Sequence, residues 1–232
     1  GAFSYHKMAE PPYHAEDMVD FYGDGGFSHG CSVDHIIFEY GDDATGSEEA
    51  KRRFEITLDL ADEFMRECCQ QKATFEPIGV VQGWSPESMI VATRALVKMG
   101  YRYIAIGGLV PLRIGPIREA VQAVHSIVKD VADAKIHLLG FGKVKYVSEL
   151  KDYKVASFDS TSPLIRAFKD NKRNYWYEDD SGEIDGYAAI RIPQSDKNLT
   201  LQRRIQKGEI SQEEVIVEER QTLEIVSAFD NE

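Results

Sequence analysis

Between residues 35 and 160, short apolar runs alternate with longer amphipathic stretches, and no other feature of the sequence constrains the fold as much. This alternation is typical of parallel strands joined by helices. The runs are apolar almost throughout, as expected for strands that are buried on both faces. We expect five strands, at residues 35–39, 78–82, 103–107, 136–141 and 155–158. The sequence therefore predicts an α/β fold built on a parallel sheet.

Helix signals fill the gaps between these runs. Ser47 is a candidate N-cap for a helix whose apolar residues recur at spacings of three and four. The next helix has Ser85 as N-cap, Pro86 at its first position and Gly100 as a left-handed stop. Residues 116–131 repeat the amphipathic pattern, and a short helix is expected near residues 147–150.

The pattern changes after Asp159, where the alternation ends and charged residues become dense. We expect a helix from Ser162, a short strand at 187–192, a helix over 201–205 and a last helix that opens at Ser211. We therefore divide the chain into residues 1–165, which carry the alternating pattern, and a mostly helical appendage of residues 166–232.

Composition excludes several classes of protein. The formal net charge of −12 argues against a protein that coats nucleic acid nonspecifically, so a nucleic-acid site would be a local basic patch. No apolar run is long enough to cross a membrane, and no signal peptide is visible, so we expect a cytoplasmic protein without membrane partners. The three cysteines form no C-x-x-C pair, and the six histidines show no metal-binding spacing.

The residues at the ends of the expected strands are polar or glycine. In parallel α/β barrels the active site gathers at the carboxyl ends of the strands. These ends hold Glu39, Gln82, Gly107–Gly108, Gly140–Phe141–Gly142 and Asp159. An amide that both donates and accepts, together with closely approaching glycine backbone, suits recognition of a planar heterocycle.

At these positions the sequence resembles the tRNA-guanine transglycosylase superfamily. The resemblance rests on four motifs in order, Val80–Val81–Gln82–Gly83, Ala105–Ile106–Gly107–Gly108–Leu109, Leu139–Gly140–Phe141–Gly142 and Ser157–Phe158–Asp159. Gly1–Ala2–Phe3–Ser4 looks like the end of the family's D-S-G-G-[FY]-Q motif. The resemblance implies a (β/α)8 TIM barrel, present here from about its middle onward over residues 1–165. The family's other essential aspartate would stand two residues before Gly1, and we interpret the start as cut or unrecorded.

Residues beyond Asp159 resemble the DpdA branch of this superfamily. The matching segments are 160–163, 174–177, 187–194 and 201–205. This branch is implied to replace guanine in DNA by a 7-deazaguanine of the preQ0 type. The zinc-binding C-x-C-x-x-C of the tRNA enzymes does not occur in the sequence, so we expect neither a metal nor a cofactor. Other proteins of a DNA-modification system are further candidate partners.

The resemblance assigns roles to individual residues. Asp159 matches the nucleophile that forms a covalent glycosyl intermediate. Gln82 and the Gly107–Gly108–Leu109 segment match base-recognition positions, and Phe3 matches an aromatic that stacks on the base. Leu139 matches the opposite wall of the pocket, and Glu39 is our candidate for the carboxylate that reads the guanine edge.

Less specific interpretations remain open for several of these residues. Asp159 can instead cap the helix that follows it, and Gln82 can be a buried amide satisfied by backbone. The basic residues can contact a phosphate backbone or belong to a packed or solvated surface. Our nucleic-acid-binding candidates are Arg166, Lys172, Arg173, Arg203 and Arg204. The alternatives to DNA base exchange are base exchange in tRNA and a non-catalytic nucleic-acid-binding subunit of the same fold.

Overall fold

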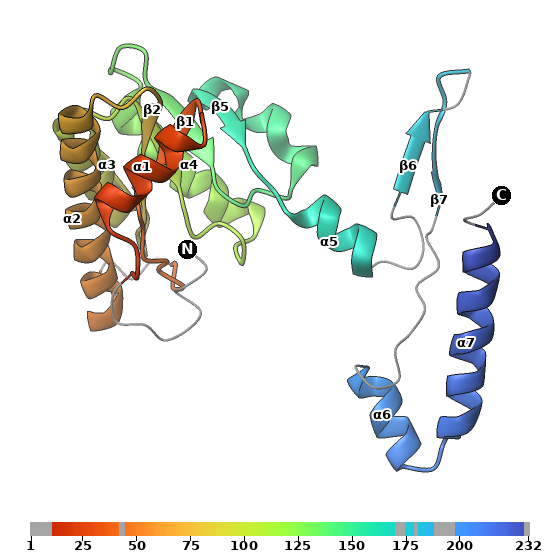
Figure 1. Ribbon diagram of the computed structural model, residues 1–232. Coiled ribbons are helices and arrows are strands. Elements are labelled where there is room, and N and C mark those ends of the chain that lie inside the picture. Colours follow the sequence, from red (N-terminus) through yellow and green to blue (C-terminus); the bar gives the residue numbers. More distant parts are fainter. Residues whose placement is uncertain (1–10, 42–44, 170–174, 179–180, 188–197, 230–232) are drawn as a thin grey trace. The chain divides into compact units, whose positions relative to one another are not determined.

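The structure is a computed structural model that describes residues 11–41, 45–169, 175–178, 181–187 and 198–229 (Figure 1). The chain divides into two compact units, Gly1–Thr161 and Ser162–Glu232.

The first unit is built on a five-stranded parallel sheet. Its strands are β1 (His29–Cys31), β2 (Glu76–Val81), β3 (Tyr103–Ile106), β4 (Lys135–Leu138) and β5 (Val155–Phe158). They lie in the order β1-β2-β3-β4-β5, so each strand pairs with its neighbour in the chain. A doubly wound sheet reverses its strand order at a switch point, and these five strands show no such reversal. The parallel sheet therefore fits part of an α/β barrel.

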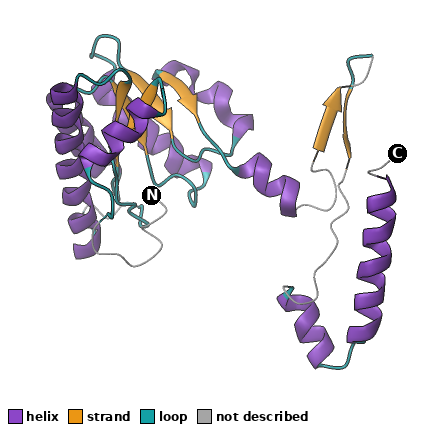
Figure 2. Cartoon of the chain, in the orientation of Figure 1, coloured by secondary structure: helices purple, strands orange, loops and turns teal. Residues whose placement is uncertain are grey.

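One helix precedes these strands and the others connect them (Figure 2). They are α1 (Ala15–Asp24), α2 (Glu48–Gln71), α3 (Pro86–Met99), α4 (Ile114–Val128) and the 3-10 helix η2 (Val144–Tyr153). The expected caps are confirmed, because the Ser47 hydroxyl accepts the Ala50 N–H and the Ser85 hydroxyl accepts the Ser88 N–H. Gly100 ends α3 with a φ of 108°, a conformation that favours glycine. Helix α1 was not anticipated from the sequence.

The two faces of the sheet differ in what they contact. Val81, Ile106 and Leu138 belong to the main core, which they share with buried residues of the first four helices. Side chains along a strand point alternately to its two faces, so the residues next to Val81, Ile106 and Leu138 point to the opposite face of the sheet. There, Ile78, Val80, Tyr103 and Ala105 form a second cluster, against which Cys31 and Leu139 pack. This second face corresponds to the interior of a barrel.

The prediction of a strand at residues 35–39 is wrong. The first strand lies earlier, at His29–Cys31, and residues 35–39 have no regular secondary structure. The physical reason is competition for backbone N–H groups. The His35 N–H donates to the Thr57 hydroxyl over 3.0 Å, and the Ile37 N–H donates to the Gln82 side chain over 3.2 Å. Side chains thus take the donors that a strand ladder would use.

The second unit holds α5 (Ser162–Lys169), the antiparallel pair β6 (Tyr175–Glu178) and β7 (Ile184–Tyr187), α6 (Leu199–Gln206) and α7 (Gln212–Phe229). Helices from Ser162, over 201–205 and after Ser211 were expected, whereas β6 was not. The strand expected at 187–192 overlaps β7 only at Tyr187, and residues 188–192 lie outside the described residues. Among the described residues, no helix is both long and apolar enough to cross a membrane.

Candidate active site

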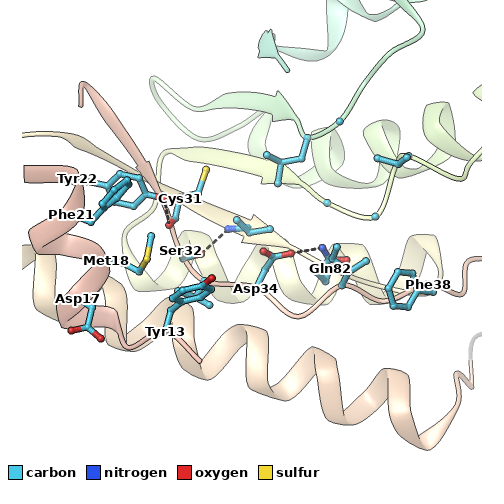
Figure 3. A pocket seen from close by; sticks show the side chains of 18 of the residues that line it. Tyr13, Asp17, Met18, Phe21, Tyr22, Cys31, Ser32, Asp34, Phe38 and Gln82 are labelled. Atoms are coloured by element: carbon cyan, nitrogen blue, oxygen red, sulfur yellow. Dashed lines mark hydrogen bonds between the residues drawn. The ribbon is translucent and has the colours of Figure 1, made fainter. Parts of the chain in front are cut away.

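A cavity of about 670 Å³ lies in the first unit, where the segments that follow β1, β2, β3 and β4 meet (Figure 3). Its polar lining includes Asp34 and Gln82, and its backbone lining includes Gly107, Gly108 and Gly140. Apolar side chains from α1 and its approach, from Tyr13 to Tyr22, line the cavity as well. The cavity therefore combines apolar walls with a few polar groups, which is typical of small-molecule sites.

Gln82 is the central polar group of this cavity. Its side chain is 1% exposed and follows β2 directly. The amide oxygen accepts the Ile37 N–H, and the amide nitrogen donates to the Asp34 carboxylate over 2.8 Å. Both ends of the amide are thus fixed by partners 45 and 48 residues away in the sequence. This fixed orientation presents a defined donor and acceptor pattern to a ligand.

Glycines 107 and 108 let the backbone after β3 approach that amide. A Cβ at Gly107 would stand 2.1 Å from the Gln82 amide nitrogen, closer than atoms can approach. Gly108 has a φ of 73°, in the left-handed region that favours glycine, and a Cβ there would stand 3.2 Å from the Gln82 amide oxygen. A side chain at position 107 would displace Gln82, and one at position 108 would be strained by the positive φ, so both positions favour glycine.

Asp34 is a pocket carboxylate that the sequence did not single out. It lines the cavity and accepts the Gln82 amide N–H. Glu39, our sequence candidate for this role, lies outside the cavity lining, and its carboxylate accepts the hydroxyl and the backbone N–H of Ser47 at 2.5 and 3.2 Å. The structure thus brings Asp34, and not Glu39, together with Gln82.

Asp159 follows β5 directly and does not itself line the cavity, but it contacts a residue that does. Its carboxylate accepts the Gly140 N–H over 2.9 Å, and Gly140 itself lines the cavity. Asp159 also accepts from His137 over 3.2 Å, and its side chain is 54% exposed. A carboxylate that is held by donors yet accessible is suited to act as a nucleophile.

Cys31 lines the cavity. Burial, followed by the negative charges of Asp34 and Asp159, raises the pKa of its thiol to about 12. Both charges therefore act on the same point at the end of β1. A thiol with so high a pKa stays protonated at neutral pH and is a poor nucleophile.

The remaining sequence candidates differ in their placement. Leu139 lines the cavity, whereas the Leu109 side chain is buried in the main core. Arg203 and Arg204 are exposed on α6, where Arg204 pairs with Glu209 over 3.3 Å, and Arg166 belongs to α5. Phe3, Lys172 and Arg173 lie outside the described residues.

Helix α1 contributes pocket residues for which the sequence gave no signal. Asp17, Met18, Phe21 and Tyr22 line the cavity from this helix, and the Tyr22 hydroxyl donates to the Cys31 carbonyl over 3.3 Å. Across the parts of the chain that the structure describes, no three His, Cys, Asp or Glu side chains gather closely enough to hold a metal ion.

The fold and the site define an α/β unit whose parallel sheet fits part of a barrel, with a largely apolar pocket that holds a few polar groups at the carboxyl ends of the strands. The chain is 38% identical over 236 residues to a DNA-guanine transglycosylase of Salmonella montevideo. The alignment covers 100% of this chain and 55% of that protein, so the chain spans about half the length of this relative. This identity supports the transglycosylase family that the motifs indicated. No protein-family model matches the chain.

Proposed function

We propose that this chain carries the base-exchange site of a guanine transglycosylase that acts on DNA and inserts a 7-deazaguanine of the preQ0 type. The observation that carries the proposal is the pairing of Gln82 with Asp34 in a cavity whose lining residue Gly140 also donates to Asp159. The name of the 38% identical relative supports DNA as the nucleic acid.

The polar groups of the cavity suit a guanine-like base. An ionised carboxylate only accepts hydrogen bonds, so Asp34 complements the N–H groups on the Watson–Crick edge of guanine. Gln82 offers both amide donor and acceptor chemistry, and it stays in place because two protein groups hold it. A 7-deazaguanine has the same edge, so one pocket accommodates both the leaving and the incoming base.

Asp159 is the nucleophile in this proposal. One carboxylate oxygen attacks C1′ of the deoxyribose, and the bond from C1′ to the guanine nitrogen breaks with its electron pair going to the base. The departing guanine takes up a proton from water. In the second half of the reaction the deazaguanine gives its ring N–H proton to water, its nitrogen attacks C1′, and the bond from C1′ to Asp159 breaks and restores the carboxylate. Each displacement inverts the configuration at C1′, so two successive displacements retain it.

A DNA substrate must present C1′ to this carboxylate. Inside a duplex the base is stacked and paired, so the nucleotide has to be extruded at a cost of a few kcal/mol. The exposed ring of Phe38 lines the cavity, with the Arg53 guanidinium 5.2 Å from its centroid. An aromatic ring with an adjacent cation is a suitable surface for an unstacked base.

The test is incorporation of labelled guanine and labelled preQ0 into duplex DNA and into tRNA by the full-length protein. Asp159→Ala and Asp159→Asn are the test variants, and Asp59→Asn, an exposed aspartate on α2, is the matched control. We expect label in DNA with the control variant and none with either Asp159 variant. A covalent protein–DNA adduct should form with wild type and with the control, and with neither Asp159 variant.

Other outcomes of this experiment discriminate between the alternatives. Label that enters tRNA and not DNA would establish tRNA base exchange and reject the DNA proposal. Label in neither nucleic acid would reject base exchange and favour a non-catalytic subunit. Label that persists in both Asp159 variants would reject Asp159 as the nucleophile.

A further inference from the structure

We propose that His137 is a positioning residue for Asp159, and that it orients the carboxylate through a hydrogen-bond chain that runs back through Ser157 to Tyr103. The inference rests on the proposed function, in which Asp159 is the nucleophile. It concerns the second face of the sheet, to which the cavity-lining residue Val80 also belongs.

His137 and Gly140 hold the same oxygen of Asp159. The His137 Nε2 lies 3.2 Å from Asp159 Oδ1, and the Gly140 N–H donates to that oxygen over 2.9 Å. Among the described residues, Oδ2 forms no hydrogen bond. Two donors on one oxygen fix the rotation of the carboxylate and leave the other oxygen available for attack on C1′.

The other nitrogen of the imidazole is also fixed. The His137 Nδ1 lies 2.5 Å from Ser157 Oγ, and that oxygen lies 2.5 Å from the Tyr103 hydroxyl. A carboxylate only accepts, so Nε2 must carry the proton that it shares with Asp159. In a neutral ring Nδ1 then accepts from Ser157, and Ser157 accepts from Tyr103. With a neutral ring, this arrangement of protons therefore satisfies all three hydrogen bonds.

A register shift in the sheet creates this alignment. Between β4 and β5 the pairing passes from Ile136 with Val155 to His137 with Ser157, so Ala156 is skipped. Without the shift His137 would lie opposite Ala156, and Ser157 and Asp159 would point to the other face. Bulges that re-aim side chains are frequent beside active sites. The irregularity here places Ser157 and Asp159 on the same face as His137.

The hydrogen-bond chain ends at Tyr103 in apolar surroundings, which limit the movement of its side chains. Tyr103 is 5% exposed and clusters with Ile78, Val80 and Ala105. Its ring meets that of His137 edge to face at 6.4 Å, and the His137 side chain is 14% exposed. Because protein interiors are closely packed, these contacts restrict the ring to one orientation.

The test compares His137→Leu with His137→Gln in the labelled-guanine exchange assay on duplex DNA. Leucine has no donor, whereas the glutamine amide can donate from nearly the position of Nε2. We expect the leucine variant to lose at least about tenfold in kcat, with KM for the base changed by less than about threefold, because positioning acts on the reacting carboxylate. Glutamine should restore most of kcat, and Ser157→Ala should give an intermediate loss.

A second measurement does not depend on activity. In 15N-labelled protein, the Nε2 proton of His137 should be observable at low field and in slow exchange with water. It should persist in Asp159→Asn, which keeps an acceptor oxygen, and disappear in Asp159→Ala. A rapidly exchanging Nε2 proton in wild type would overturn the hydrogen-bond chain even if the protein exchanges bases.

The assay separates failure of this inference from failure of the proposed function. Wild-type exchange together with unchanged kcat in His137→Leu would overturn the positioning role and leave base exchange intact. Equal losses in the leucine and glutamine variants, with lowered thermal stability in both, would indicate a structural role and overturn it as well. Absence of exchange in wild type would reject the proposed function and, with it, the positioning role.

Discussion

The Gln82 amide donates a 2.8 Å hydrogen bond to the Asp34 carboxylate, across 48 residues of sequence. This contact joins the end of β2 to the irregular segment after β1 and sets the polar pattern of the cavity.

Asp34→Asn should weaken base recognition much more than Glu39→Gln. Asparagine replaces an acceptor-only group by one that also donates, so contacts with guanine N–H groups are lost. Because hydrogen bonds to charged groups contribute about 1.5–3 kcal/mol, we expect kcat/KM for guanine exchange to fall about 10- to 100-fold. The Gln variant keeps an oxygen for Ser47 and should match wild type. Equal losses in both variants would contradict the assignment of Asp34.

Gly107→Ala should disrupt the pocket through Gln82. The added Cβ would stand 2.1 Å from the Gln82 amide nitrogen and force that side chain away from Asp34. Since displaced buried polar groups cost about 1–3 kcal/mol, we expect a loss of about fivefold or more in binding of labelled guanine. Gly115→Ala is the control, because no atom lies within 4 Å of its added Cβ. Normal binding in Gly107→Ala would show that Gln82 does not hold the base.

The cysteines should differ in their rate of alkylation. At about pH 8 a thiol with a pKa of about 12 is ionised in about one molecule in ten thousand, and the thiolate is the reactive form. Cys69 is exposed, whereas burial raises the pKa of the Cys68 thiol to about 11. Iodoacetamide should therefore label Cys69 first and Cys31 last, as measured by peptide mass spectrometry.

The charge of Asp34 provides a control for the same experiment. Asp34 follows burial among the causes that raise the Cys31 pKa, so Asp34→Asn should lower that pKa and speed labelling of Cys31. Labelling of Cys69 should not change. Rapid alkylation of Cys31 in the wild-type protein would contradict its placement in the cavity.

Tyr101→Phe should destabilise the first unit. The Tyr101 ring is fully buried, and its hydroxyl donates to the Ala61 carbonyl over 2.7 Å. Removing this bond should lower the free energy of unfolding by about 1 kcal/mol in a denaturant titration. Tyr153→Phe removes an exposed contact with Gln122 and should leave stability within about 0.5 kcal/mol. The expected order would be refuted by a larger loss in Tyr153→Phe.

Local sequence signals predicted much of the first unit. Ser47, Ser85 and Gly100 marked helix ends because capping depends on residues within one turn. Four of the five expected strands overlap observed ones, since strands buried on both faces are recognisable as short apolar runs. Gln82 and Asp159 follow two of those runs, so their place at the carboxyl ends of the strands followed from the pattern.

The sequence alone thus determined the alternation of strands and helices, several of the helix ends and the strand-end positions of Gln82 and Asp159. Only the tertiary structure showed that Asp34, and not Glu39, contacts Gln82. Asp34 and Glu39 lie five residues apart in the sequence, whereas Gln82, which donates to Asp34, lies 48 residues from Asp34. It also decided that residues 35–39 form no strand and that a register shift aligns Ser157 with His137. Periodicity reports which face of a local element is apolar, whereas these features depend on hydrogen bonds between segments that are distant in the sequence.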